Sequence, residues 1–264
     1  MINVKDLTVR VGEHTLVDQV SFTTQAGEVT GLIGPNGAGK STVLAAVAGD
    51  IEYSGEITVG GLSPKAPPRE LARTRAVMLQ DVSVSFEFLV RDVVAMGRRP
   101  WEGTAYADLD DAFIDAALDT VGVAHLAGRD ISTLSGGERA RAAFARVLAQ
   151  NTPVILLDEP TAALDIRHQE QLLGSVKALA REAGVAVLVV LHDLNAAAAY
   201  CDHVVCLSCG GLAAQGRVDE VFTGRTLSQV YDWPISVDGL RVHPQRATPA
   251  INPLFSHHLE DFHV

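Results

Sequence analysis

The sequence predicts an α/β fold with a parallel sheet at its centre. Short apolar runs at residues 28–33, 154–157 and 185–191 have the length and composition of buried parallel strands. A stretch with helical spacing of apolar residues follows each run, so strands and helices alternate along the chain. A glycine-rich turn, residues 34–42, joins the first of these strands to its helix. These three observations carry the fold class.

The glycine-rich turn has the pattern of a phosphate-binding loop. It matches G-x-x-x-x-G-K-[ST] and comprises Gly34, Pro35, Asn36, Gly37, Ala38, Gly39, Lys40, Ser41 and Thr42. Its backbone N–H groups and the positive end of the following helix would converge on the β- and γ-phosphates of a nucleotide such as ATP. Lys40 would add a point charge there, and Ser41 a hydroxyl for Mg²⁺. A glycine turn that binds nothing is the alternative, against which the flanking strand and helix argue.

Composition limits the classes of protein to which the chain can belong. It has 264 residues, 47% of them hydrophobic, enough for one large domain or two lobes. The longest apolar run, residues 185–191, is too short to span a bilayer, and residues 1–6 do not begin a secretion signal. We therefore expect a cytosolic chain, unless a partner holds it at a membrane. The formal net charge of −11 argues against a nucleic-acid partner.

Three cysteines lie close together in the sequence near His203. Cys206 and Cys209 have the C-x-x-C spacing of zinc ligands. No second C-x-x-C follows, however, and Cys206 belongs to an apolar run. This favours reduced structural thiols over a zinc site for both residues and for Cys201.

The N-terminal part of the chain is predicted to consist mainly of strands. Two long strands surround a turn at Gly12 and Glu13, and shorter strands follow the phosphate loop. A charged, helical run separates the last two strands. The expected elements are, in order, strands 2–11 and 16–25, helix 41–49, strand 55–59, a helix within 64–73 and strand 75–79, which ends at Gln80.

A change of pattern divides the chain. Helical patterns at 90–97 and 109–121 replace the strands, which predicts a helical lobe at about residues 81–133, inserted into the α/β core. We expect one nucleotide-binding domain over residues 1–235 and an irregular tail over residues 236–264. After the lobe the expected elements are a helix ending at 150, strand 154–157, helix 166–182, strand 185–191, helix 194–201 and strand-like runs 204–207 and 212–215.

Two acidic residues end one of the apolar strands. Asp158 and Glu159 follow residues 154–157, and carboxylates at the end of a buried strand cost free energy unless they pair or take part in chemistry. Asp158 would hold Mg²⁺, directly or through water. Glu159 would polarise a water molecule lined up with the γ-phosphate. A plain strand end with solvated acids is the alternative, which the phosphate loop upstream disfavours.

The segment Leu-Ser-Gly-Gly-Glu combines a helix signal with two glycines. Ser135 and Glu138 have the S-x-x-E spacing of a capping box, at the start of the helix that ends at Gln150. A capped helix alone would be a purely structural feature. Gly136 and Gly137, however, each cost about 1 kcal/mol of helix propensity relative to alanine. Bare backbone in this first turn would let an anion approach the helix N-terminus closely.

These motifs occur in the order found in the ATP-binding subunits of ABC transporters, and the chain resembles that family over about residues 1–230. The positions that carry the resemblance are the phosphate loop, Gln80, residues 134–138, Asp158 and Glu159, Asp165 after Ala163 and Leu164, and His192. The resemblance implies a P-loop NTPase with a RecA-like core, an antiparallel β-subdomain and an inserted helical lobe.

The resemblance also implies roles for these residues. Lys40, Glu159, Gln80 and His192 would form the catalytic set, in which Gln80 reaches the metal and reports to the transmembrane partner while His192 contacts the γ-phosphate. The metal would be held by Ser41, Gln80 and Asp158. Asp165 would communicate across a dimer. The segment that contacts the γ-phosphate held by the other subunit would comprise Ser135, Gly136, Gly137 and Glu138.

The partners follow from the number of motifs in the chain. There is one phosphate loop and one Leu-Ser-Gly-Gly-Glu, with no internal repeat. Two copies facing head to tail would therefore build two composite ATP sites in a homodimer. The resemblance implies that this dimer binds a transmembrane permease dimer at the cytoplasmic face of the cell membrane, with a periplasmic or surface substrate-binding protein as an indirect partner.

Several stretches narrow the resemblance to one group of importers. Residues 73–80, residues 90–100 and His192-Asp-Leu-Asn195 look like the importers of iron chelates, cobalamin and haem. The arginines before Gln80 and the His243-Pro244 pair look most like the haem importer ATPases. The alternatives are a ferric siderophore or cobalamin as cargo, or a soluble ATPase of iron–sulfur assembly.

One departure from the family concerns the base of the nucleotide. The family usually stacks adenine on an aromatic residue of the first β-hairpin, and this chain has no Phe, Tyr or Trp between Ile2 and Val20. Val9, Val11 or His14 would have to serve. We therefore expect weak discrimination between bases.

The segment after Gln80 offers a candidate contact with the permease. It contains apolar Phe86, Phe88 and Leu89, followed by residues 98–101 with Arg98 at their start. Apolar anchors with a charged rim are what a groove for an amphipathic helix requires, and the resemblance implies that this region receives a short cytoplasmic helix of the permease. Packing within the helical lobe is the alternative.

Overall fold

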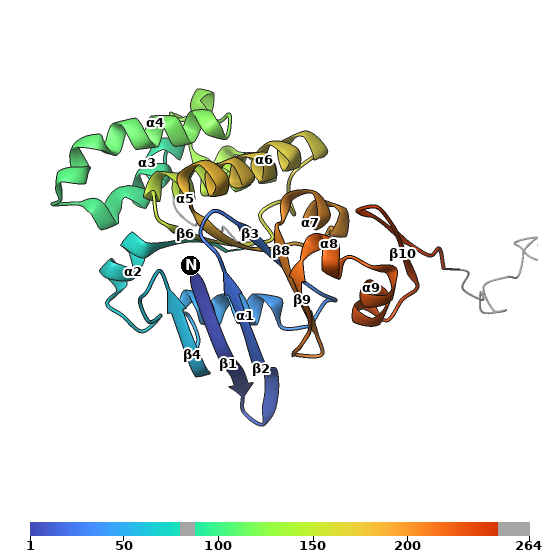
Figure 1. The fold of residues 1–264 in the computed structure, drawn as a ribbon. Coiled ribbons are helices and arrows are strands. Elements are labelled where there is room, and N and C mark those ends of the chain that lie inside the picture. The colour runs from blue at the N-terminus through green and yellow to red at the C-terminus, as the bar shows by residue number, and fades with distance from the viewer. Residues whose placement is uncertain (80–87, 248–264) are drawn as a thin grey trace, which may run out of the picture.

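The computed structural model describes residues 1–79 and 88–247, and its centre is a six-stranded sheet (Figure 1). The strand order is β5-β6-β7-β3-β8-β9, in which every pair is parallel except β8 and β9. Strands β3, β6 and β7 are buried along their whole length, which confirms the predicted parallel sheet. The bounds are Val29–Ile33 (β3), Arg75–Met78 (β5), Val154–Asp158 (β6), Ala186–Val190 (β7), His203–Ser208 (β8) and Gly211–Arg217 (β9).

A second, antiparallel sheet has the order β2-β1-β4 and shares an apolar core with one face of the first. Its strands are Ile2–Val11 (β1), His14–Thr24 (β2) and Ser54–Val59 (β4), and β1 and β2 join at the predicted turn. Helix α1, Lys40–Ala48, contributes Val43, Leu44 and Val47 to the same core. The predicted antiparallel β-subdomain is therefore confirmed, and it packs next to the start of α1.

The helices between β5 and β6 have an apolar core of their own, formed with α5. The predicted helix 90–97 ends early, because Pro100 lacks an N–H and the chain at Gly97 approaches α5 so closely that a Cβ there would lie 2.3 Å from the Arg146 carbonyl oxygen. The bounds after β5 are Val90–Ala95 (α3), Met96–Trp101 (η1), Ala105–Leu109 (η2), Asp110–Thr120 (α4), Ala124–Leu126 (η3), Ile131–Thr133 (η4) and Gly136–Gln150 (α5), while Pro68–Thr74 (α2) precedes β5.

The C-terminal part is more regular than predicted. The expectation of an irregular tail from residue 236 was wrong for its first residues, since they form a hairpin whose turn contains Gly239 at φ +59° and whose Val242 is buried. Alternation of Val237 with polar neighbours was the overlooked signal. The bounds are Ile166–Ala183 (α6), Leu194–Tyr200 (α7), Val218–Val221 (α8), Gly224–Tyr231 (α9), Ile235–Asp238 (β10) and Arg241–Pro244 (β11).

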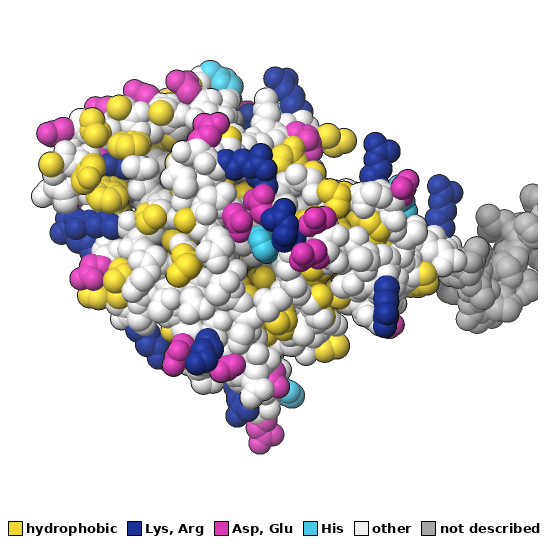
Figure 2. Space-filling model, viewed as in Figure 1, with side chains coloured by type: hydrophobic (Ala, Val, Ile, Leu, Met, Phe, Trp, Pro, Cys, Tyr) yellow, Lys and Arg dark blue, Asp and Glu magenta, His cyan; other side chains and the backbone are white. Residues whose placement is uncertain are grey.

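The surface of the described residues is mixed in character. Acidic and basic side chains are interspersed on the face drawn in Figure 2, and apolar side chains gather there over the helical lobe formed by α3 to α4. In Figure 1 this lobe and the C-terminal elements α9 and β10 lie at opposite ends of the central sheet. Within the described ranges, every helix is too short or too polar to cross a membrane.

Candidate functional site

The phosphate loop connects β3 to α1 through backbone conformations that favour glycine. Gly34, Gly37 and Gly39 have φ values of +147°, +77° and +96°. At Gly34 there is also no room for a side chain, because a Cβ would lie 2.2 Å from the Leu207 carbonyl oxygen of β8. The first glycine of the motif is therefore required both by its backbone angles and by its contact with the neighbouring strand.

Lys40, the first residue of α1, is buried with its ammonium group turned back on the loop. Its Nζ atom donates to the carbonyl oxygens of Gly34 at 2.9 Å and Pro35 at 3.0 Å. Burial lowers the pKa of Lys40, and the nearby carboxylates of Glu159 and Asp158 partly oppose that shift. The positive charge is thus fixed inside the curve of the loop, where a phosphate would be attracted.

Asp158 ends β6 beside the start of α1. The Ser41 hydroxyl donates to its Oδ1 atom at 3.3 Å, and Asp158 is 6% exposed. Burial raises the pKa of this carboxyl group, against the effect of the Ser41 hydrogen bond. Two predicted metal ligands from segments far apart in the chain therefore lie in contact.

Glu159 and His192 come together from the ends of adjacent parallel strands, β6 and β7. The Nε2 atom of His192 lies 2.5 Å from the Oε1 atom of Glu159. Glu159 has a left-handed backbone with φ +48°, which is strained for a residue with a side chain. Strain of this kind is typical of functional positions, and here it occurs where the chain leaves the strand.

These residues border one cavity of about 760 Å³. It extends beyond the predicted site residues to strand β2 and to the turn between β8 and β9. Its lining is formed by Thr15, Leu16, Asn36, Gly37, Gly39, Lys40, Ser41, Thr42, Glu159, His192, Cys209 and Gly210. Phosphate loop, proposed base and proposed γ-phosphate contact therefore share a single space.

The cavity residues from the first hairpin are not those that were expected to contact the nucleotide base. Val9 is 2% exposed and cannot stack on a nucleotide, so its candidacy was wrong. Leu16, which is 40% exposed, lines the cavity instead, together with Cys209 and Gly210. The Gly210 carbonyl oxygen accepts a hydrogen bond from the Asp18 N–H at 2.9 Å, which ties the β8–β9 turn to β2. Periodicity gave no sign that these two segments meet.

The Leu-Ser-Gly-Gly-Glu segment does not line this cavity, but it forms the predicted capping box. Ser135 Oγ accepts from the Glu138 N–H at 3.3 Å, and Glu138 Oε2 accepts from the Ser135 N–H at 2.8 Å. Gly136 and Gly137 lie near Ala163, two residues before Asp165: an added Cβ would be 3.8 Å from the Ala163 Cβ at Gly136 and 3.2 Å from the Ala163 carbonyl oxygen at Gly137. The Asp165 carboxylate accepts from the His168 N–H at 2.9 Å and caps α6. Neither segment borders the cavity at the chain's own phosphate loop.

The remaining candidate residues are Gln80 and the three cysteines. Gln80 lies outside the described residues. Cys206 is wholly buried in β8 and Cys201 is buried nearby, whereas Cys209 is exposed. Burial raises the pKa of the Cys201 and Cys206 thiols to about 12, so both are protonated at neutral pH. Within residues 1–79 and 88–247, no group of three or more His, Cys, Asp or Glu side chains could hold a metal.

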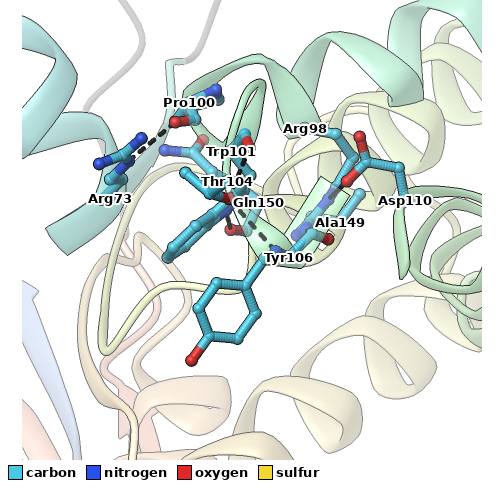
Figure 3. A network of polar contacts seen from close by, with 9 residues as sticks. All are labelled: Arg73, Arg98, Pro100, Trp101, Thr104, Tyr106, Asp110, Ala149 and Gln150. Atoms are coloured by element: carbon cyan, nitrogen blue, oxygen red, sulfur yellow. Dashed lines mark hydrogen bonds and ion pairs between the residues drawn. The ribbon is translucent and has the colours of Figure 1, made fainter. Parts of the chain in front are cut away.

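Arg98 was predicted on the charged rim of a docking groove, and this was wrong. It is 2% exposed, with Nε donating to Asp110 at 2.7 Å and Nη1 to the Ala149 carbonyl oxygen at 2.8 Å (Figure 3). Trp101 Nε1 donates to the Gln150 carbonyl oxygen at 2.8 Å. The last carbonyls of α5 need partners, and a cation is favoured at a helix C-terminus. Arg98 therefore points into the lobe, where it binds the C-terminal end of α5.

The other docking candidates differ in position. Phe86 lies outside the described residues, whereas Phe88 and Leu89 are 37% and 45% exposed.

Gln150, which is drawn in Figure 3, also binds α2 and β5: its Nε2 atom donates to the carbonyl oxygens of Ala72 at 2.6 Å and Arg75 at 2.9 Å. The C-terminus of α5 is therefore bound both to the helical lobe and to the strand that precedes Gln80.

One contact at the phosphate loop had no signal in the sequence. The Tyr231 hydroxyl of α9 accepts a hydrogen bond from the Gly34 N–H at 3.1 Å. The two residues are 197 positions apart. Only a folded structure or covariation between relatives could have paired them.

The sequence is similar to proteins of one family. The ABC transporter family model matches residues 17–162. The chain is 53% identical to the hemin import ATP-binding protein HmuV of Streptomyces coelicolor over 234 residues, which cover 88% of this chain and 83% of that protein. It is 43% identical to the protein of the same name from Bordetella avium over 259 residues, 93% of this chain and 96% of that protein.

Solved structures give the same result. A chain from a structure described as a metal-chelate type ABC transporter in an inward-facing conformation matches with a TM-score of 0.78 and 26% identity, over 94% of this chain and 98% of that one. A dimeric ATP-binding cassette in a post-hydrolysis state, bound to ADP and Pi, matches with a TM-score of 0.73 and 26% identity, over 82% of this chain and 98% of that one. The chain therefore belongs to the ABC transporter family, as one of its ATP-hydrolysing subunits.

Proposed function

We propose that the chain is the ATP-hydrolysing subunit of an importer of hemin. The cavity shared by the phosphate loop, Glu159 and His192 carries the proposal of a hydrolytic site. The cargo rests on the relatives, since proteins named for hemin import are 53% and 43% identical over most of their length. No residue of this chain is proposed to touch the cargo.

The donor set fits a magnesium ion bound together with ATP. Ser41 and Asp158 offer hydroxyl and carboxylate oxygens, the ligands that Mg²⁺ prefers. The raised pKa of Asp158 reflects a buried carboxylate that a divalent cation would compensate. When bound, the ion would neutralise charge that develops on the β- and γ-phosphates. Gln80 is proposed as a further ligand from the resemblance alone.

Hydrolysis would follow from the arrangement of three side chains. Lys40 would move its ammonium group from the loop carbonyls to the phosphate oxygens, which are stronger acceptors. Glu159 would accept a proton from a water molecule in line with the γ-phosphate. His192, whose Nε2 atom contacts Glu159, would instead donate this N–H to a γ-phosphate oxygen when ATP is bound.

Two copies of the chain are proposed to build each complete site. Ser135 and Gly136 are exposed, and neither they nor Asp165 border the cavity of their own chain. A helix N-terminus with bare glycine backbone can reach a γ-phosphate only from a second copy facing head to tail. The matching cassette described as a dimer supports this arrangement.

The membrane partner is proposed to be a permease dimer, which would hold the ATPase at the cytoplasmic face of the cell membrane. Partly exposed Phe88 and Leu89, with the apolar side chains over the helical lobe, support docking there (Figure 2). A surface or periplasmic binding protein would deliver the cargo. A ferric siderophore or cobalamin is the second candidate cargo, supported by the match to a metal-chelate type transporter.

The decisive experiment is reconstitution of uptake. The tagged chain is used to capture its permease from membranes, and the complex is placed in vesicles with the cognate binding protein. We expect ATP-dependent uptake of hemin that excess ferric siderophore or cobalamin does not reduce, and no uptake with a Glu159→Gln subunit. Uptake of a ferric siderophore or cobalamin without uptake of hemin would show that this compound, and not hemin, is the cargo. Purification without a permease, together with iron–sulfur assembly proteins, would contradict the transport role.

A further inference from the structure

The C-terminal elements α9, β10 and β11 contact the nucleotide site at two points. One contact reaches the first glycine of the phosphate loop, and the other reaches the segment that carries His192. We propose that Tyr231 is a positioning residue of the nucleotide site, which holds the Gly34 peptide in the conformation that binds phosphate. The proposal rests on the ATP site described above and assigns to the C-terminal elements a part in it.

The Gly34 peptide is held from three sides. Its N–H donates to Tyr231 Oη at 3.1 Å, its carbonyl oxygen accepts from Lys40 Nζ at 2.9 Å, and the Leu207 carbonyl leaves no space for a Cβ. The first two contacts are on either side of the same Cα, so a displacement of Gly34 changes both of them. A shift of the phenol would therefore be felt by the lysine that attracts the phosphates.

The chemistry of the phenol suits this role. Burial raises the pKa of Tyr231, so the side chain stays a neutral hydroxyl at physiological pH. It can then serve as the acceptor for a buried N–H without bringing a negative charge toward the phosphates. A carboxylate in its place would repel the same ligand.

A second contact joins the same C-terminal elements to the other side of the site. The Asn195 side chain accepts from the Val242 N–H at 2.8 Å and donates to the Val242 carbonyl oxygen at 3.4 Å. Asn195 lies in the first turn of α7, whose N-cap, Asp193, follows His192 directly. The hairpin is thus connected to the histidine end of the cavity.

The two contacts are mechanically linked. Ser228 of α9 accepts from the Ile235 N–H at 2.8 Å and donates to the Ile235 carbonyl oxygen at 3.2 Å. This pair binds the helix that carries Tyr231 to the hairpin that carries Val242. The C-terminal elements therefore connect the phosphate loop to the segment that follows His192 through a series of hydrogen bonds.

The test compares two single-atom deletions. Tyr231→Phe removes the acceptor of the Gly34 N–H, whereas the control Tyr200→Phe removes a hydroxyl that donates to Glu170 at 2.6 Å and does not contact the loop. Leaving the Gly34 N–H without its partner should raise the Kd for ATP and the KM roughly tenfold, with kcat within about twofold of wild type. Tyr200→Phe should leave all three constants unchanged.

A second measurement keeps the proposal testable if Tyr231→Phe fails to fold. In the wild-type chain, amide exchange followed by NMR should show the Gly34 N–H protected at least roughly a hundredfold without nucleotide. Unchanged KM in Tyr231→Phe, or a Gly34 amide that exchanges at the rate of a free chain, would overturn the proposal. A wild-type chain that does not bind ATP would instead refute the nucleotide site itself.

Discussion

His192 and Glu159 are in direct contact, with 2.5 Å between Nε2 and Oε1, although 33 residues separate them in the chain. The contact follows from strand register. Asp158 pairs with Val190 on neighbouring parallel strands, so the residues just beyond both strand ends emerge at the same edge of the sheet. Each side chain restrains the other at the position where a γ-phosphate and its attacking water would meet.

Replacing Glu159 by Gln should separate binding from hydrolysis. The amide has nearly the same shape and can still accept from His192, but it cannot take a proton from water. We expect ATP affinity close to wild type and hydrolysis slower by roughly 10²- to 10⁴-fold. Dimers should accumulate with ATP in light-scattering measurements, because the nucleotide persists. Turnover close to the wild-type rate would remove Glu159 from the mechanism.

Mixing two inactive variants should restore activity if the ATP site is shared between chains. Lys40→Ala damages the phosphate loop, and Gly136→Asp places a carboxylate in the partner-facing helix turn. Gly136 is preferable to Gly137, because its added Cβ meets only Ala163 Cβ at 3.8 Å, whereas at Gly137 the Ala163 carbonyl oxygen would be 3.2 Å away. Heterodimers then contain one intact site, so up to about a quarter of wild-type ATPase should return.

The matched control for this mixture is Gly136→Ala, which adds the Cβ without the charge and should retain most activity. Heterodimer formation is checked with two different affinity tags. Heterodimers that form without any recovered hydrolysis would contradict a shared site with independently working halves.

The ionised carboxylate of Asp158 should lower the free energy of unfolding at neutral pH when no metal is bound. Burial raises its pKa above the ordinary value of 3.8, so the folded chain holds its proton to higher pH than the unfolded chain. The free energy of unfolding should therefore fall as pH rises from 3.8 through the raised pKa. Asp158→Asn should remove this loss and stabilise the chain by about 0.5–2 kcal/mol at pH 7.

The measurement is thermal unfolding of both chains between pH 4 and 8 without nucleotide or Mg²⁺. The difference between them should shrink toward the acid end, where the wild-type carboxyl is protonated. Asp158→Asn should also lose Mg²⁺-dependent ATP hydrolysis. A wild-type chain that gains stability relative to the variant with rising pH would contradict the assignment of a desolvated carboxylate.

Charge reversal at Arg98 should unfold the helical lobe rather than merely uncouple it from a permease. Arg98→Glu would put a second carboxylate beside Asp110 in a buried place and leave the Ala149 carbonyl without its donor. The cost should be about 3–5 kcal/mol. Arg91→Glu is the control, since Arg91 pairs with Asp111 and Asp115 near the surface and should cost only about 1 kcal/mol.

Urea unfolding gives both free energies, and ATPase assays follow the same variants. Arg98→Glu should lose stability and hydrolysis together. If Arg98→Glu instead retains stability and hydrolysis while transport fails, Arg98 acts at the membrane interface and its buried contacts do not stabilise the lobe.

The elements that the sequence predicted well are those with local signals. The strand before Gly34, the phosphate loop and the capped helix from Ser135 each depend on residues within about ten positions of one another. The fold class then follows from strand–helix alternation, because parallel strands need crossover helices.

What the sequence did not predict depends on contacts between distant segments. Leu16 meets Gly210 only after two sheets have packed, and Arg98 is drawn inward by carbonyls at the end of α5. The β10–β11 hairpin was not predicted, because the sequence of a short strand with polar neighbours resembles that of an irregular segment. No spacing rule connects residues of this kind.

Helix α5 also has a mechanical consequence. It begins at the Ser135 cap, where a second copy is proposed to approach, and ends at Gln150, fixed to the lobe through Trp101 and to α2 and β5 through its own amide. Its 15 residues give it a length of about 22 Å. Because α5 also supplies buried residues to the core of the helical lobe, a displacement imposed at its glycines would be transmitted to the lobe as far as Trp101.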